Sequence, residues 1–306
     1  MIPAATRPCF CGESRARVRF RTNRFGLVAC PSCGCYRIDP PPISTEDEAG
    51  SFYTDYYANL RGDNANGAAA PTPPAPDLSR RSSRFWRVAE RVPALLRAGG
   101  SAADIGCGEG RLCAELRQAG WSTVIGVDVS QTRIARARQL YPDIIFHDRP
   151  IEEVDVPAGS LDLIVLDNVI EHLVDPLDAV RRLRPLLTPT GLIVLITPNM
   201  QSGSFRLLGR RWTPELAPHA HIFLFTHGAM RRMLTSAGFA VEAQGDFHLP
   251  VYSMRAWLRR LMGGDVKDIV WHAMQEMGGL YGRLIGAGPM LFAVAHADPG
   301  SMPVRP

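Results

Sequence analysis

Hydrophobic positions between residues 84 and 247 follow two alternating periods. Short apolar runs of strand length are separated by segments in which apolar residues recur at helical spacing. This alternation is typical of βαβ units, in which a helix follows each strand and the strands form a mostly parallel sheet. The pattern therefore predicts an α/β fold for this part of the chain.

The expected elements follow one another along this segment and continue to the end of the chain. We expect strands at residues 101–105, 124–127, 144–146, 161–166, 192–196, 239–243 and 290–295. We expect helices at residues 84–97, 111–119, 133–140, 178–187 and 228–237, the last of them ended by a glycine. The sequence thus predicts seven strands in one sheet.

Composition divides the chain into three parts. Residues 1–40 hold five of the seven cysteines and are expected to form a small Cys-rich module. Residues 41–83 are rich in Pro, Ala and Gly, above all at 62–76, and we expect a flexible linker because such a stretch buries too little apolar area to offset its ordering entropy. Residues 84–306 are expected to form the α/β domain, with a helical insertion at 248–288.

Overall composition excludes few functions. The chain has 306 residues, 46% hydrophobic and 21% charged, which is an ordinary globular balance. The formal net charge of +4 carries little weight, since a nucleic-acid-binding protein more often shows a concentrated basic stripe. No secretory signal and no long apolar run are seen, so we expect a cytoplasmic protein. The oligomeric state is left open.

A glycine-rich loop is the first candidate for chemistry. Residues 104–110 read Asp-Ile-Gly-Cys-Gly-Glu-Gly, between a predicted strand and a predicted helix. Glycine at 106 and 108 lets the backbone turn sharply and approach a ligand, and the helix that follows offers free N–H groups. The spacing differs from the Gly-x-Gly-x-x-Gly of dinucleotide folds. On its own the loop is equally compatible with an ordinary strand-to-helix turn.

An acidic residue on the next strand makes this loop more specific. Asp128 ends the second predicted strand, 18 residues after Gly110. In this topology an acid at that position can accept hydrogen bonds from ribose hydroxyls. The alternative is a helix N-cap role, which Ser130 could fill instead. The loop and the acid together predict a nucleotide-type cofactor.

These residues resemble the class I S-adenosylmethionine-dependent methyltransferases. The resemblance runs from about residue 102 to residue 238, and the motifs that carry it are residues 104–110, 127–130, 161–165, 167–172 and 191–199. It implies a Rossmann-like, seven-stranded methyltransferase sheet and S-adenosylmethionine as cofactor. The Cys-rich start of the chain further resembles a subgroup of these enzymes with an N-terminal zinc-ribbon-like segment.

The resemblance also implies roles for individual residues at the strand carboxyl ends. Asp104 would orient the glycine loop or reach the amino group of the methionine part, and Asp128 would hold the ribose. Residues 148–151 would flank the adenine, while Asp167 and Asn168 would lie beside the sulfonium. The full set of expected cofactor-binding residues is Asp104, Gly106, Cys107, Gly108, Asp128, Val129, Ile151, Asp167 and Asn168.

Methyl transfer from a sulfonium needs alignment more than acid–base chemistry. The donor is already activated, so a base helps only when the acceptor is a hydroxyl that loses a proton. His172, which follows Glu171, and His219 and His221, which lie in the connection after the fifth strand, are the candidate bases. That connection commonly forms the acceptor pocket in the family. A structural role remains the alternative for each histidine.

Four cysteines have a spacing typical of a metal site. Cys9 and Cys11, and then Cys30 and Cys33, form two pairs that are each followed by a glycine, an arrangement that favours tetrahedral zinc. The first pair is spaced by one residue rather than the usual two. Cys35 is an alternative ligand. A reduced hairpin without metal is the competing interpretation.

The leading function is methyl transfer from S-adenosylmethionine to a small-molecule hydroxyl. The zinc-ribbon subgroup is associated with sugars, glycan precursors and secondary metabolites, so we expect an acceptor of that kind. A nucleic-acid methyltransferase is disfavoured because residues 167–170 read Asp-Asn-Val-Ile instead of Asn/Asp-Pro-Pro-aromatic. A non-catalytic cofactor-binding protein is disfavoured by the intact glycine loop. The helical insertion predicts a cap or dimer contact, with peripheral membrane contact as a further alternative.

Overall fold

The structure is a computed structural model of the 306-residue chain, and it describes residues 8–45, 48, 52, 77–78, 81–97, 99–211, 216–248, 274 and 277–300. Most of the predicted linker and residues 249–273 of the predicted insertion lie outside the described residues. The chain divides into two compact units. Unit 1 comprises Met1–Pro42, Thr197–Met230 and Gln244–Phe292, and unit 2 comprises Ile43–Ile196, Arg231–Ala243 and Ala293–Pro306.

The larger sheet has seven strands, as the sequence predicts. Their order is β10-β11-β8-β7-β4-β5-β6. The strands are β4 (Ser101–Ile105), β5 (Thr123–Val127), β6 (Ile145–His147), β7 (Leu161–Asp167), β8 (Leu187–Pro198), β10 (Phe239–Phe247) and β11 (Met290–Ala297). The neighbours β4 and β5, β4 and β7, β5 and β6, and β7 and β8 pair in parallel. The prediction of a Rossmann-like α/β sheet is confirmed.

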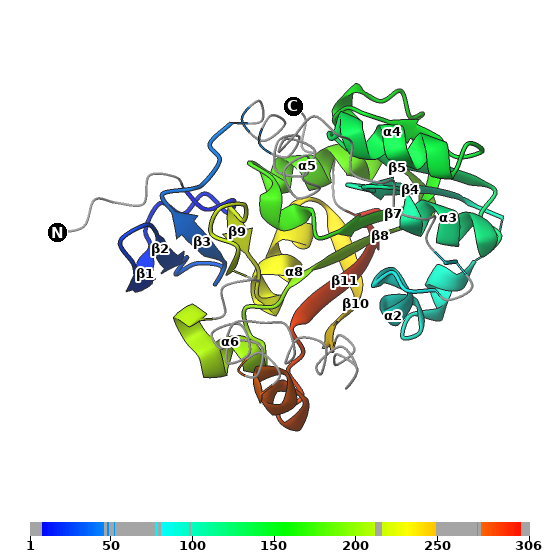
Figure 1. Cartoon of the computed structure of the whole chain (residues 1–306). Coiled ribbons are helices and arrows are strands. Elements are labelled where there is room, and N and C mark those ends of the chain that lie inside the picture. The colour runs from blue at the N-terminus through cyan, green and yellow to red at the C-terminus, as the bar shows by residue number, and fades with distance from the viewer. Residues whose placement is uncertain are drawn as a thin grey trace, which may run out of the picture. The chain divides into compact units, whose positions relative to one another are not determined.

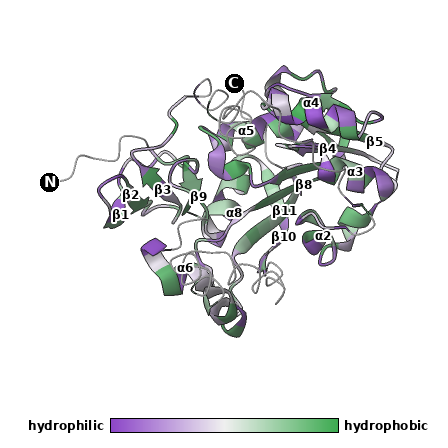
Figure 2. Ribbon diagram, viewed as in Figure 1, coloured by the Kyte–Doolittle hydropathy of each residue, from purple (hydrophilic) through white to green (hydrophobic). Residues whose placement is uncertain are grey.

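The central strands of this sheet are apolar along nearly their whole length. Residues 163–166 of β7 and 192–196 of β8 are all buried. Strands of a parallel sheet are covered on both faces, so they read as continuous runs of Leu, Ile and Val rather than as an alternation of apolar and polar residues. Figure 2 shows the hydrophobic colour along β8 and β11. These buried strands form the core, and they position the polar residues that lie at their ends.

Helices alternate with the strands of this sheet, and α3 and α4 lie between β4 and β6 in the chain (Figure 1). The α-helices are α2 (Phe85–Ala89), α3 (Arg111–Gln118), α4 (Gln131–Leu140), α5 (Pro176–Leu183), α6 (Gly203–Leu208) and α8 (His227–Ser236). The 3₁₀ helices are η1 (Pro93–Leu96), η2 (Ile151–Glu153), η3 (Ile170–His172), η4 (Arg184–Leu186) and η5 (Gly209–Arg211). Residues 277–284 are also helical.

Prolines account for the two helices whose bounds differ most from expectation. The helix expected at residues 84–97 ends at Ala89, and a 3₁₀ helix begins at Pro93. Proline has no N–H to donate and disfavours helical geometry at the preceding residue, so one continuous helix cannot form. The helix expected from residue 178 instead begins at Pro176, where the Asp175 side chain accepts a hydrogen bond from the Asp178 N–H.

A smaller sheet lies in unit 1. Its four strands are β1 (Arg17–Arg21), β2 (Gly26–Ala29), β3 (Tyr36–Asp39) and β9 (Phe223–Leu224), in that order and all antiparallel. Figure 1 shows the yellow strand β9 beside the blue strand β3. The buried residues that pack beneath these strands are Leu27, Ile38, Met200, Leu208, Leu216 and Leu224. The Cys-rich start of the chain therefore shares its sheet and its core with residues from far along the sequence.

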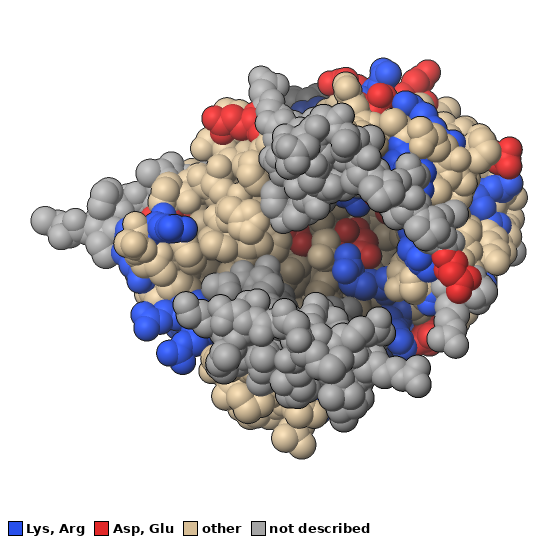
Figure 3. Space-filling view, in the orientation of Figure 1, with Lys and Arg blue, Asp and Glu red and all other residues tan. Residues whose placement is uncertain are grey.

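Among the described residues, no helix is both long enough and apolar enough to cross a membrane. Figure 3 shows blue basic and red acidic side chains interspersed over the face that it presents. One local charged pair joins Arg182 and Asp178 on α5, whose side chains lie 2.6 Å apart.

Candidate functional site

The glycine loop occupies the carboxyl end of β4, in unit 2. Gly106, Gly108 and Gly110 have φ values of 74°, 58° and 79°, in the left-handed region that favours glycine. A Cβ atom at Gly106 would collide with Val169, and one at Gly108 would collide with Arg133. The left-handed conformation disfavours other residues at both positions, and crowding against Val169 adds to this at Gly106.

Asp128 ties this loop to the neighbouring strand. Its Oδ2 accepts a hydrogen bond of 2.8 Å from the Gly108 N–H, and its Oδ1 accepts one of 2.9 Å from the Ser130 N–H. Arg133 Nη1 lies 3.9 Å from Oδ2. Each carboxylate oxygen has a second lone pair, so both can still accept hydrogen bonds from a ligand. The acid is thus held in one orientation with acceptor capacity remaining.

Two further acids lie at the ends of β4 and β7. Asp104 is 4% exposed, and its Oδ2 lies 3.7 Å from the Cys113 thiol. Asp167 accepts a hydrogen bond of 2.7 Å from Arg84 Nε. Burial, and then the charge of Asp167, raises the pKa of Asp104 well above its usual range. Burial also raises the pKa of Asp167, although the Arg84 guanidinium opposes it. A cationic amino group placed here would relieve this repulsion.

Asn168 follows directly and has an orphaned polar atom. Its φ of 57° is left-handed, which is uncommon for a residue other than glycine, and its N–H donates to the Ile196 carbonyl. Its buried Oδ1 has no hydrogen-bond partner among the described atoms. Buried polar atoms are nearly always paired, and strained backbone tends to occur at functional sites. The side chain is therefore set up to meet a group that comes from outside the protein.

The remaining expected cofactor residues lie around the same strand ends. Cys107 is buried within the loop, and Val129 is half-buried after β5. Ile151 is half-buried at the start of η2, which follows β6. Just before it, Asp148 pairs with Arg138 at 3.3 Å. All nine expected cofactor residues thus lie near the carboxyl ends of β4, β5, β6 and β7, either on the strand or on the segment that follows it.

The three candidate histidines belong to different units. His172 is half-buried and ends η3, in unit 2. His219 is exposed and His221 is 6% exposed, and both belong to unit 1. The N–H of His221 donates to the Ala217 carbonyl, which closes a turn. A base role for any of the three stays a prediction.

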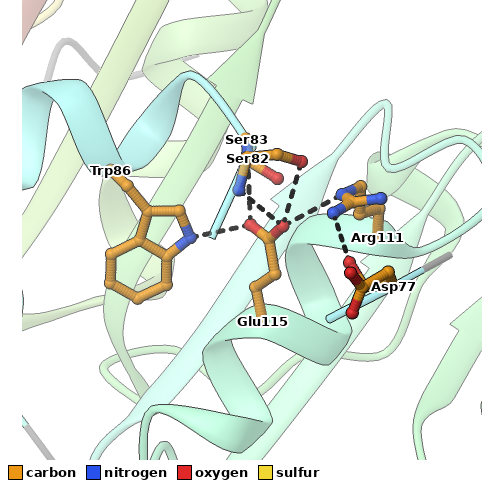
Figure 4. Close-up of polar contacts among 6 residues, drawn as sticks. All are labelled: Asp77, Ser82, Ser83, Trp86, Arg111 and Glu115. Atoms are coloured by element: carbon orange, nitrogen blue, oxygen red, sulfur yellow. Dashed lines mark hydrogen bonds and ion pairs between the residues drawn. The ribbon is translucent and has the colours of Figure 1, made fainter. Parts of the chain in front are cut away.

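Sequence reasoning missed a buried carboxylate that organises the approach to the site. Glu115 on α3 is fully buried and accepts hydrogen bonds from the Ser82 N–H at 3.0 Å, the Ser83 N–H at 3.3 Å and Trp86 Nε1 at 2.7 Å (Figure 4). Arg111 Nε donates to it at 3.0 Å. Ser82 and Ser83 immediately precede Arg84, so Glu115 fixes the segment from which Arg84 reaches Asp167.

The four predicted cysteine ligands come together in unit 1. The sulfur atoms of Cys9, Cys11, Cys30 and Cys33 all lie within 4.8 Å of one another. Cys9 and Cys33 are 3.5 Å apart, and Cys11 and Cys30 are 3.6 Å apart. A tetrahedral zinc site with bonds of about 2.3 Å places its sulfur atoms about 3.8 Å apart, so the cluster has the dimensions of such a site.

The fifth cysteine of this region, Cys35, contacts Cys9 and also two backbone carbonyls. The Cys35 thiol donates to the Tyr36 and Leu224 carbonyls, both at 3.4 Å. Two glycine turns close the cluster, since the Gly12 N–H donates to the Cys9 carbonyl and the Gly34 N–H donates to the Cys30 carbonyl. Hydrogen bonds from Cys33 and Cys35 lower the pKa of Cys9, whereas burial raises the pKa of Cys11 and the hydrogen bond to Cys9 raises that of Cys33.

Residues 79–244 match the family described as a methyltransferase domain, and this match covers more than half of the chain. The chain belongs to this methyltransferase family. The matched span includes the glycine loop, Asp128, Asp167 and Asn168, so the strand ends described above lie inside the methyltransferase domain. The sequence prediction of a class I S-adenosylmethionine-dependent methyltransferase fold is confirmed.

Named relatives agree with this assignment. A ubiquinone biosynthesis O-methyltransferase from Bradyrhizobium diazoefficiens is 40% identical over 158 residues, which cover 48% of this chain and 61% of that protein. The chain thus matches about three fifths of the length of that curated relative.

Two solved structures share the fold. One belongs to a Haloferax volcanii complex between the Trm112 methyltransferase activator and a methyltransferase, with a TM-score of 0.57 at 15% identity, over 83% of this chain and 99% of that one. The other is an S-adenosylmethionine-dependent methyltransferase from Mesorhizobium loti, with a TM-score of 0.50 at 22% identity, over 71% of this chain and 99% of that one.

Proposed function

We propose that the methyltransferase domain binds S-adenosylmethionine at the carboxyl ends of β4, β5 and β7 and transfers its methyl group to a hydroxyl of a small molecule. The observation that carries the proposal is the pairing of Asp128 with the glycine loop, beside the orphaned amide oxygen of Asn168. Both features leave hydrogen-bond acceptors ready for a ligand. The family match supports a methyl donor as that ligand.

The proposed placement of the cofactor follows the charge of the site. Asp128 accepts hydrogen bonds from the ribose hydroxyls, and the loop of Gly106, Cys107 and Gly108 lies against the methionine part. Asp104 and Asp167, whose charges repel each other, favour the cationic amino group. Asn168 lies beside the sulfonium, Val129 lies near the ribose and Ile151 lies beside the adenine. When bound, the cofactor supplies an activated methyl group.

The proposed acceptor is a hydroxyl of a sugar, a glycan precursor or a secondary metabolite. The name of the Bradyrhizobium relative supports transfer to oxygen, because that protein is called an O-methyltransferase. A hydroxyl gains nucleophilicity when it loses its proton, and histidine is the side chain that most often accepts one near neutral pH. His172, His219 and His221 are the residues that we propose for this step.

Labelled cofactor tests the proposed activity directly. Purified protein, methyl-labelled S-adenosylmethionine and a fractionated cell extract are expected to give label in a polar small-molecule or lipid-linked glycan fraction. The same reaction with Asp128→Asn controls for transfer by other enzymes in the extract. Label that accumulates in RNA would replace the proposal with a nucleic-acid methyltransferase, and tight cofactor binding without any labelled product would replace it with a non-catalytic cofactor-binding protein.

We further propose that residues 1–40 hold a structural zinc ion on Cys9, Cys11, Cys30 and Cys33. Four thiolates in a tetrahedral cluster suit zinc. Elemental analysis of the purified protein is expected to find about one zinc per chain. Cys33→Ser is expected to lose it, whereas Cys35→Ser is expected to keep it because the Cys35 thiol is directed at carbonyl oxygens. Equal zinc loss in both variants would make Cys35 a ligand.

A further inference from the structure

Arg37 on β3 is buried, and two of its guanidinium nitrogens have no hydrogen-bond partner within the described part of the chain. The residue is 3% exposed, and both its Nη1 and its Nη2 are buried without a hydrogen-bond partner among the described atoms. An uncompensated buried cation is strongly destabilising, so buried guanidinium groups are normally paired with an anion. The nearby acids in the described part of the N-terminal segment are already engaged, since Glu13 pairs with Arg15 at 2.9 Å and Asp39 pairs with Arg21 at 3.5 Å.

The register of the β2–β3 hairpin places Arg37 on the same side as two of the cysteines. Arg37 lies opposite Val28, and the N–H of Cys30 donates to the carbonyl of Cys35, which continues the same pairing by two residues. Side chains two residues apart on a strand point to the same face of a sheet. Arg37, Cys35 and Cys30 therefore share one face, and the guanidinium lies near the sulfur cluster.

Electrostatics agrees with this placement. The charge of Arg37 is among the interactions that lower the pKa of Cys9, behind the hydrogen bonds from Cys33 and Cys35. The guanidinium thus interacts with the Cys9 sulfur in a buried environment, where charges are poorly screened.

A metal bound to the four cysteines would provide an anionic centre for Arg37. Four thiolates around one divalent ion leave two negative charges, which is a larger buried anion than four free thiols provide. We propose that Arg37 is the counter-charge of a tetrathiolate metal centre formed by Cys9, Cys11, Cys30 and Cys33, an inference that rests on the zinc site proposed above. The arginine costs stability in the metal-free protein and stabilises the metal-loaded protein, so it makes the cluster selective for a thiolate-bound divalent ion.

Zinc affinity of the full-length protein tests this proposal independently of methyl transfer. Arg37→Met is compared with wild type in equilibrium competition against a chromogenic zinc chelator. Substitution of a residue that supports metal ligands typically costs about 10- to 100-fold in affinity, and we expect a loss of that size. Arg17→Met removes the same charge from an exposed position on β1 of the same sheet and is expected to leave the zinc affinity unchanged.

Thermal unfolding gives a second test, because the change in the unfolding midpoint is expected to have opposite signs in the loaded and chelated proteins. An arginine with a purely structural role would not give opposite signs. Arg37→Met is expected to lower the unfolding midpoint of the zinc-loaded protein but to raise that of the chelated protein. If Arg37→Met does not fold, Arg37→Lys and Arg37→Gln replace it, with the lysine variant retaining more of the zinc affinity. Unchanged affinity in the neutral variant, or equal destabilisation of the loaded and chelated proteins, would overturn the proposal.

Discussion

Glu115→Leu is expected to lower the free energy of unfolding by about 3 kcal/mol, because it leaves several buried donors without their shared acceptor. The Ser82 and Ser83 N–H groups and the Trp86 indole N–H all donate to this carboxylate, and leucine fills a similar volume without accepting any of them. Chemical denaturation of the purified variant measures the change. Glu90→Leu is the matched control, because Glu90 is exposed and its carboxylate lies 3.9 Å from Arg87. A loss below about 1 kcal/mol would show that water replaces the carboxylate.

The contribution of Glu115 is also expected to depend on pH. Burial raises the pKa of this carboxyl, but hydrogen bonds from Ser83, Ser82 and Trp86 outweigh burial and leave the pKa below its usual range. The folded protein therefore binds this proton less readily than the unfolded chain does, and the stabilisation is present in full above the ordinary carboxyl range and is lost as the pH falls. The difference in unfolding free energy between wild type and Glu115→Leu should shrink on acidification.

Asp128→Asn is expected to weaken the binding of S-adenosylmethionine at least about 100-fold. The substitution removes the negative charge and one acceptor, so charge-assisted hydrogen bonds to the ribose are lost, each worth about 1.5–3 kcal/mol. The released Gly108 N–H adds to the loss, because Asp128 also holds the glycine loop. Isothermal titration calorimetry with the cofactor measures the affinity.

Asp178→Asn is the control for this change. It removes one carboxylate from an exposed ion pair on α5 and leaves the glycine loop untouched. An unchanged affinity in Asp128→Asn would mean that the ribose is held elsewhere, and the proposed orientation of the cofactor would then be wrong. Loss of affinity in both variants would point to net charge rather than to a specific contact.

The sheet could be predicted from the sequence because its signals are local. Residues 101–105 read Ser-Ala-Ala-Asp-Ile between two glycines, and β4 has those same bounds in the structure. The helix expected at residues 84–97 shows the limit of the approach, since the break before Pro93 depends on one residue within an otherwise helical pattern. β9 has only two residues and is a strand because it pairs with β3, so no local sequence pattern predicts it.

The candidate cofactor site shows the same division. Asp128 and the glycines could be found from their spacing along two consecutive strands. Arg84 could not, because its role depends on Asp167, 83 residues further along the chain. The role of Arg37 could not be predicted either. It depends on the burial of the side chain and on two guanidinium nitrogens that have no hydrogen-bond partner among the described atoms, and only the structure shows these.

The pairing of β3 with β9 decides where the protein can be shortened. A fragment limited to the family-matched residues 79–244 would keep β9 but would remove β3, together with Phe10, whose ring lies 6.0 Å from those of both Phe223 and Phe225. The same cut would delete β11, the neighbour of both β8 and β10. Unpaired strand edges and bared aromatic rings promote aggregation. The span that defines the family is therefore shorter than the span that folds, and expression trials should retain both flanking segments.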